Sequence, residues 1–138
     1  MQPTDFIERI GLLRRRISAL GASAYAQLDL GTMQAKLIRH IGKHSAISQA
    51  ELARATDSDP TLTSRTLATL IARGLVKKER SAEDRREYVL ELTAAGKRLR
   101  EKVDRLRSEM AARVVAALSA ADLAEFDRVT QKIISALG

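Results

Sequence analysis

The chain contains no cysteine, no tryptophan and only two prolines among its 138 residues. Without cysteine it can form no disulfide and carries no thiol for redox sensing. Aromatic residues make up 3% of the chain, and the abundance of alanine and leucine favours helices. No apolar stretch approaches the length that spans a membrane, and the N-terminus lacks an apolar signal segment, so we expect a cytoplasmic protein.

Acidic residues are outnumbered by basic ones, 17 against 24, which gives a formal net charge of +7. Such an excess favours a polyanionic partner. The basic residues cluster on a short helix and the hairpin after it, and not along one long amphipathic face, so double-stranded DNA is favoured over a membrane surface. At this length we expect one domain, residues 1–138.

Motifs for catalysis are also missing. The only histidines, His40 and His44, lie one helical turn apart, a spacing that can hold zinc. No cysteine or nearby carboxylate completes a ligand set, and no zinc-protease motif, nucleophile elbow or phosphate-binding glycine loop occurs. We therefore predict no enzyme activity, no cofactor and no metal site. The histidine pair is assigned a structural or surface role, with zinc sensing as the alternative.

The segment from Asp59 to Gly74 has the pattern of a short basic helix. Asp59 is the expected N-cap, Pro60 suits the first helical position and Gly74 suits the end. Positions 63, 67, 70, 71 and 74 are predicted to face inward. The outward face then has small, hydrogen-bonding and basic side chains and no carboxylate, as a helix in the DNA major groove requires. An ordinary amphipathic surface helix is the alternative.

The neighbouring segments favour the DNA-binding interpretation. Ser48 to Glu51 reads as a capping box that begins a short helix, and Thr56 to Ser58 is a tight turn into the next one. Downstream, residues 75–80 and 87–92 are predicted strands joined by an arginine-bearing tip at 81–86. Such a tip suits a minor groove, although a solvated charged tip is the plainer alternative.

From Leu30 to Leu99 the chain resembles the MarR family of winged helix-turn-helix transcriptional regulators. The motifs that carry this resemblance are L-x-x-x-Q at 30–34, A-E-L-A at 50–53, D-P-T-L-T-S-R at 59–65, L-I-A-R-G-L-V at 70–76 and R-S-A-E-D-R-R at 80–86 followed by L-T-A-A-G at 92–96. The resemblance implies a mainly α fold with a small β-hairpin wing. A winged helix-turn-helix over about 30–96 would be flanked by dimerisation helices over about 5–28 and 97–138.

The chain departs from the family at three positions that are usually apolar in the helix-turn-helix, Thr56, Ser58 and Thr63. Thr63 can bond back to a carbonyl one turn earlier, so its hydroxyl is tolerable, but the turn should pack less tightly. Leu62 is an unusual bulky apolar group on the outward face. It is expected either to touch a thymine methyl group or to compensate locally for the polar turn.

Apolar stripes mark the flanking helices. We predict a first helix over residues 5 to about 20, a connection over 21–29 and a scaffold helix over 30–44. A long helix capped by Thr93 should reach about Leu118, and Ser119 should cap the last one. Stripes at both ends of a small chain suggest a two-chain interface. The predicted dimer-interface residues are Phe6, Ile10, Leu13, Ile17, Met110, Val114, Leu123, Phe126, Ile133 and Leu137.

The helix, its cap and the wing supply the predicted DNA contacts. Arg65 is expected to read a guanine edge or clamp a phosphate, and Arg85 and Arg86 to act in the wing, with Asp84 orienting an arginine through an ion pair. The full set of predicted DNA-binding residues is Ser48, Gln49, Thr61, Leu62, Ser64, Arg65, Thr69, Arg73, Arg80, Arg85 and Arg86.

These features predict a homodimeric, sequence-specific transcriptional regulator, expected to be a repressor, on a palindromic operator. The alternative is an architectural protein that coats DNA without reading its sequence, but such a protein needs mainly cations on its binding face. The resemblance also implies release from DNA by a small aromatic acid bound between the dimer helices and the winged part. The nearest candidate residues are Arg16, Tyr25 and His40, and no effector is assigned.

Overall fold

The computed structural model describes residues 1–138 and contains six helices and one two-stranded antiparallel sheet. In chain order the elements are α1 (Pro3–Ala26), α2 (Thr32–Gly42), α3 (Gln49–Ala55), α4 (Pro60–Ala72), β1 (Val76–Arg80), β2 (Tyr88–Leu92), α5 (Ala94–Val115) and α6 (Ala120–Leu137). This arrangement confirms the predicted fold class, mainly α with a β-hairpin wing.

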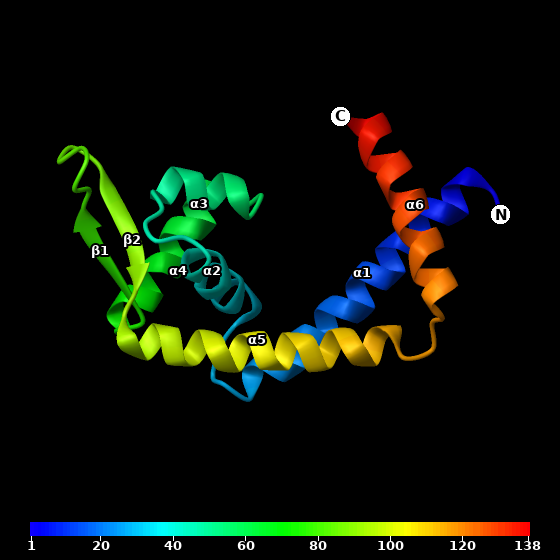
Figure 1. Cartoon of the computed structure of the whole chain (residues 1–138), viewed down its shortest axis with the longest axis horizontal. Coiled ribbons are helices and arrows are strands. Elements are labelled where there is room, and N and C mark those ends of the chain that lie inside the picture. The colour runs from blue at the N-terminus through cyan, green and yellow to red at the C-terminus, as the bar shows by residue number, and fades with distance from the viewer.

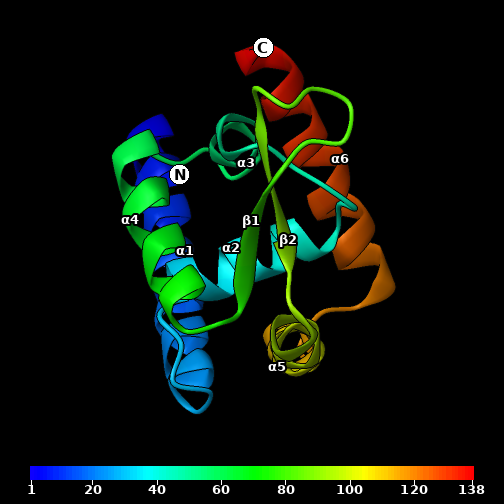
Figure 2. The same ribbon diagram turned by 90° about the vertical axis from the view of Figure 1, so that its left-hand side faces the viewer.

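Two parts of the molecule are joined by α5, which extends from one to the other (Figure 1). We call α2, α3, α4 and the hairpin the winged lobe, and α1 with α6 the arm. Figure 2 shows the winged lobe end-on, with α4 on one side of the hairpin and α5 beneath its base. Both chain termini lie at the far end of the arm (Figure 1).

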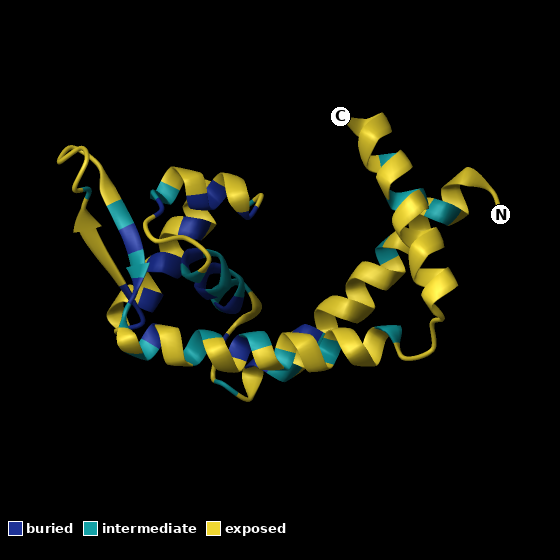
Figure 3. Cartoon of the chain, in the orientation of Figure 1, coloured by how far each residue is buried: buried dark blue, intermediate teal, exposed yellow.

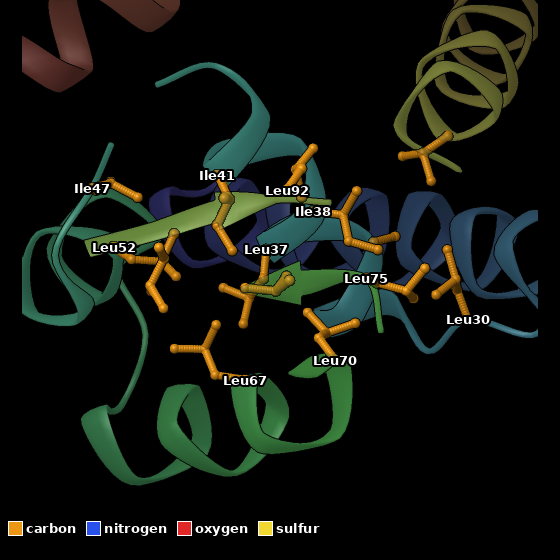
Figure 4. Close-up of a cluster of buried hydrophobic side chains, with 14 of the residues drawn as sticks. Leu30, Leu37, Ile38, Ile41, Ile47, Leu52, Leu67, Leu70, Leu75 and Leu92 are labelled. Atoms are coloured by element: carbon orange, nitrogen blue, oxygen red, sulfur yellow. The ribbon is translucent and has the colours of Figure 1, made fainter. Parts of the chain in front are cut away.

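The hydrophobic core lies in the winged lobe and is centred on α2. Leu37, Ile38 and Ile41 of α2 are fully buried and belong to the same cluster as Leu52 of α3 and Leu70 of α4 (Figure 4). Burying one such side chain is worth about 1.5–3 kcal/mol. Buried residues are concentrated in this lobe, whereas the arm is mostly exposed (Figure 3). The core therefore fixes α3 and α4 against α2.

Two of the three polar residues of the helix-turn-helix, Thr56 and Thr63, are buried, and each has a hydrogen-bond partner; Ser58 is half-buried. Thr56 and Thr63 are 2% and 0% exposed. The Thr56 hydroxyl donates to the Leu52 carbonyl at 2.7 Å, and the Thr63 hydroxyl donates to the Asp59 carbonyl at 3.0 Å. The backward bond predicted for Thr63 is thus confirmed. Because a buried hydroxyl with a partner avoids most of its desolvation cost, these positions are tolerated in the core.

The hairpin pairs β1 with β2 in a register that sets Val76 opposite Leu92 and Arg80 opposite Tyr88. The chain before α3 adds a short third segment to this sheet, since Ile47 and Leu90 exchange backbone hydrogen bonds of 3.4 and 2.7 Å. Leu90 and Leu92 are buried, whereas Tyr88 lies beyond the core and is 41% exposed. The base of the wing is therefore held in the core while its tip projects.

The first helix is longer than predicted. It continues through Gly21 to Ala26, where a connection was expected over 21–29. Gly21 is buried, and a Cβ there would stand 3.6 Å from the Met110 sulfur and 3.7 Å from the Tyr25 ring. The close approach of α1 to α5 at this glycine supplies tertiary packing that outweighs its poor helix propensity.

Three helices end with a residue in the left-handed region. Asp29, Asp57 and Gly74 have φ values of 55°, 48° and 72°. In each case the amide of the following residue bonds back to a carbonyl five positions earlier, at 3.0 or 3.1 Å. This is the geometry of a Schellman motif, in which glycine is the usual residue. The tight turn of the helix-turn-helix is made by Asp57 in this conformation.

Replacing Asp57 with glycine should raise the free energy of unfolding by about 0.5–1 kcal/mol. A left-handed backbone is strained for aspartate but not for glycine, so the substitution removes this strain from the folded state. The stabilisation is partly offset by the greater conformational entropy of glycine in the unfolded chain. Urea denaturation at a fixed protein concentration measures the change. As the reciprocal control, Gly74→Ala should lower stability by about 1 kcal/mol, the cost of placing alanine in a left-handed backbone. No steric clash adds to this cost, because an added Cβ meets nothing within 4 Å. A destabilised Asp57→Gly variant would contradict this account.

Candidate nucleic-acid interface

The N-terminus of α3 is capped by Ser48, whose hydroxyl oxygen accepts the Glu51 N–H at 3.1 Å. The reciprocal bond of the predicted capping box, from the Ser48 N–H to the Glu51 carboxylate, is absent. The Ser48 hydroxyl keeps its own proton and can still donate to a phosphate oxygen. Gln49, the first residue of α3, is half-buried beside it. The structure therefore leaves both residues available to an anion at this helix end.

Helix α4 is capped as predicted, with the Asp59 carboxylate accepting the Thr61 N–H at 2.9 Å. Its buried stripe differs from the prediction, because Thr66 is buried whereas Ile71 is 38% exposed. Gly74, also predicted to face inward, is exposed just beyond the end of the helix. Positions 63, 66, 67 and 70 centre the stripe on the core, so Ile71 falls at its edge. The residues predicted to face outward are all exposed, as is Ser64 at the edge of that face; they are Thr61, Leu62, Arg65, Ala68, Thr69 and Ala72.

The outward face of α4 has no carboxylate and one unengaged cation. The Arg65 carbonyl accepts the Thr69 hydroxyl at 3.3 Å, but the Arg65 guanidinium has no hydrogen-bond or ion-pair partner within the chain. Leu62 is 43% exposed and, with Arg65 and Met33, borders a shallow hollow between α4 and the start of α2. One part of the Leu62 side chain therefore lines this hollow, and the other part is exposed and can contact a ligand.

Arg73, predicted to contact DNA, is engaged within the protein. Its Nη1 donates to the Asp29 carbonyl and to Gln34 Oε1, both at 2.8 Å. The guanidinium is thus turned toward the junction of α1 and α2. The helix pattern did not reveal this, because both partners lie about forty residues earlier in the chain. The residues that sequence reasoning missed here are Asp29 and Gln34.

The wing carries a second group that sequence reasoning missed. Lys78 Nζ and the Arg80 guanidinium lie over the Tyr88 ring, 4.9 and 4.8 Å from its centre. Arg80 also donates to the Arg85 carbonyl. Cation–π contacts of this kind favour a fixed position for the arginine. The strand register is the signal that could have found the group, because it sets Tyr88 directly opposite Arg80.

The tip of the wing is an internally bonded turn. The Ser81 hydroxyl accepts the N–H groups of Glu83 and Asp84 at 3.2 and 3.3 Å. The predicted ion pair of Asp84 with an arginine is not present; instead its carboxylate accepts the backbone N–H of Arg86 at 3.0 Å. Aspartate commonly bonds to the backbone two residues on, which competes with an exposed ion pair of low value. The side chains of Arg85 and Arg86 are exposed.

The three residues predicted to lie nearest a bound effector, Arg16, Tyr25 and His40, differ in their burial. Tyr25 is buried in the core cluster, whereas Arg16 is exposed on α1. Burial, followed by the positive charges of Arg39 and Lys43, lowers the pKa of His40. His40 is therefore neutral at neutral pH. No group of three or more histidine, aspartate or glutamate side chains is arranged to hold a metal ion, and no helix is both long and apolar enough to cross a membrane.

The sequence matches a known family. Residues 28–87 match the sequence model of the MarR family. A curated relative, the HTH-type transcriptional regulator BilQ of Clostridium symbiosum (strain WAL-14163), is 30% identical over 94 residues, which are 68% of this chain. The chain spans 65% of the length of that relative.

Solved structures share the fold. A MarR-like transcription regulator from Bacillus cereus ATCC 10987 has a TM-score of 0.88 and 18% identity, covering 98% of this chain and 97% of that one. A mutant MarR from E. coli, solved in complex with operator DNA, has a TM-score of 0.84 and 20% identity, covering 96% of this chain and 99% of that one. At these identities the similarity concerns the fold alone.

Proposed function

The chain belongs to the MarR family, and from this we propose that it is a sequence-specific DNA-binding transcriptional regulator that acts as a homodimer. The observation that carries the proposal is the outward face of α4, which is exposed, free of carboxylates and equipped with an unengaged Arg65. Such a face can enter a major groove without phosphate repulsion and can read base edges. The solved operator complex of a protein with the same fold supports DNA as the partner.

The wing supports the same function. It projects from the winged lobe beside α4 (Figure 2), and its exposed Arg85 and Arg86 lie at the tip. Arginine side chains enter narrow A·T-rich minor grooves, where the electrostatic potential is most negative. The proposed interface therefore combines base contacts from α4, minor-groove contacts from the wing and phosphate contacts from Ser48 and Gln49 at the start of α3.

A two-fold dimer is proposed because the arm leaves apolar side chains uncovered. No residue of α6 is buried, and Phe126 and Ile134 are 59% and 61% exposed. A second copy of the arm is the simplest cover for these side chains. Two recognition helices about one turn of DNA apart would then read a palindromic operator. An operator that overlaps a promoter would exclude RNA polymerase, so repression is the proposed outcome.

Binding to DNA of two kinds tests the proposal. The purified protein would be titrated with the DNA upstream of its own gene and with scrambled DNA of equal length, at several salt concentrations. We expect the upstream DNA to bind tighter by a factor of about 10³ or more. If the protein binds both DNAs equally, promoter fragments recovered by a genomic pull-down would be tested next. Equal binding to these fragments as well would favour the alternative, an architectural protein that coats DNA without reading its sequence. A small aromatic acid such as benzoate, the proposed effector class, can be added to the same assay.

Replacing Arg86 with alanine should weaken operator binding by about 1–3 kcal/mol, with most of the loss on sites with A·T-rich flanks. The physical reason is the loss of a cation from the minor groove, where potential depends on groove width. Fluorescence anisotropy with A·T-rich and G·C-rich flanks measures the difference. Arg14→Ala removes an equal charge from an exposed position on α1 and serves as the control. An unchanged affinity for Arg86→Ala would refute the minor-groove assignment.

A further inference from the structure

Arg73 joins the ends of three helices. It follows the last residue of α4, and its Nη1 donates at 2.8 Å both to the Asp29 carbonyl, just beyond α1, and to Gln34 Oε1 in the first turn of α2. The Asp29 carboxylate is fully exposed and stands 3.8 Å from Arg73 Nη2. An exposed ion pair of that length contributes little, so the two hydrogen bonds define the contact.

The Asp29 carbonyl is free to accept because of how α1 ends. Asp29 has a φ of 55°, and the Leu30 N–H bonds to the Tyr25 carbonyl at 3.1 Å across it. No backbone N–H donates to the Asp29 carbonyl. Leu30 and Tyr25 on either side of this turn are buried in the core cluster. The acceptor is therefore held by buried neighbours, and it offers Arg73 a fixed point on the protein.

We propose that Arg73 is a positioning residue that sets the orientation of the recognition helix and makes no contact with DNA itself. Asp59 caps the start of α4, and Arg73 ties its end to the α1–α2 junction. The guanidinium donates to two acceptors from one nitrogen in a planar group, which the rotatable ammonium of lysine does not reproduce. This inference rests on the proposed DNA-binding function and assigns one residue a new role within it.

A recognition helix that is free to tilt loses base contacts sooner than phosphate attraction. Base-edge hydrogen bonds need positions accurate to a fraction of an ångström, whereas the attraction of phosphates depends on net charge. Loosening the end of α4 should therefore lower affinity for the operator and spare affinity for scrambled DNA. A phosphate contact behaves differently, because its loss weakens binding to all sequences and reduces the salt slope by about one.

Two charge-preserving variants make the test. Arg73→Lys keeps the cation, and Gln34→Ala removes one acceptor without changing charge. We expect each to weaken operator binding by about tenfold and to leave scrambled-DNA binding and the salt slope unchanged, with the double variant no weaker than the worse single one. Asp29→Asn removes the exposed carboxylate but keeps the carbonyl acceptor, and it tolerates the left-handed backbone. It should bind like the wild type.

The outcomes separate the inference from the proposed function. Near-UV and far-UV circular dichroism first establish that each variant is folded. If Gln34→Ala and Arg73→Lys both keep wild-type operator affinity, the positioning role is wrong. If Gln34→Ala is silent while Arg73→Ala lowers the salt slope by about one, Arg73 is a phosphate contact. If the wild type itself fails to discriminate any operator from scrambled DNA, the proposed function fails, and the positioning role falls with it.

Discussion

Replacing Leu123 and Phe126 together with glutamate is expected to convert the protein to monomers and to weaken binding to a palindromic operator by about 10² or more. The two side chains are 41% and 59% exposed on α6, a helix that buries no residue in the single chain. Two carboxylates at a proposed apolar interface would have to be desolvated without partners. Each monomer would then bind one half-site without the second, and the gain from effective concentration would be lost.

The measurements are analytical ultracentrifugation for mass and anisotropy for affinity. Lys132→Glu is the matched control, because it changes the net charge by the same two units at an exposed position on the opposite side of α6. It should remain dimeric, with only the modest loss expected from net charge. A doubly substituted protein that still sediments as a dimer would show that the interface lies elsewhere. A monomeric variant that binds the operator with wild-type affinity would contradict the proposal that two protomers bind two half-sites.

Replacing Gly96 with alanine is expected to destabilise the protein by about 1–3 kcal/mol or more. A Cβ at this position would overlap the carbonyl oxygen of Leu75 and come within 3.3 Å of the Leu92 Cβ. That carbonyl also accepts the Thr93 N–H at 3.1 Å. Relief would require α5 to move away from the base of the wing, with loss of buried contacts and of this hydrogen bond.

Urea denaturation at a fixed protein concentration measures the cost, since the stability of the proposed dimer would depend on protomer concentration. Gly31→Ala is the control, because Gly31 caps α2 with a φ of −72° and an added Cβ meets nothing within 4 Å. Its cost should stay below about 1 kcal/mol. Equal effects of the two substitutions would mean that close packing is not the reason for glycine at position 96.

Local chemistry made much of the fold predictable. Ser48, Asp59, Thr93 and Ser119 each cap the helix that the sequence assigned to them, because an N-cap needs only its own side chain and an amide two or three residues on. The strands lie within one residue of their expected positions, since the alternation of buried and exposed residues has a short period. The outward face of α4 followed from helical spacing in the same way.

Contacts between distant segments could not be read from such patterns. The engagement of Arg73 depends on Asp29 and Gln34, and the continuation of α1 depends on the approach of Gly21 to Met110. Ile71 was misplaced because the width of a buried stripe is set by what packs against it.

By itself, the sequence determined the order of the elements, the N-cap residues, most of the buried stripe of α4 and the family motifs. These rest on interactions within a few residues or on matched motifs. Only the tertiary structure decided which polar side chains are free for DNA and which are engaged within the protein. Arg65, Arg73 and Asp84 look alike as exposed charged residues in the sequence, and only the fold separates a free guanidinium from one held by a distant carbonyl. The physical reason is that hydrogen-bond partners are chosen by distance in space, which chain order does not encode.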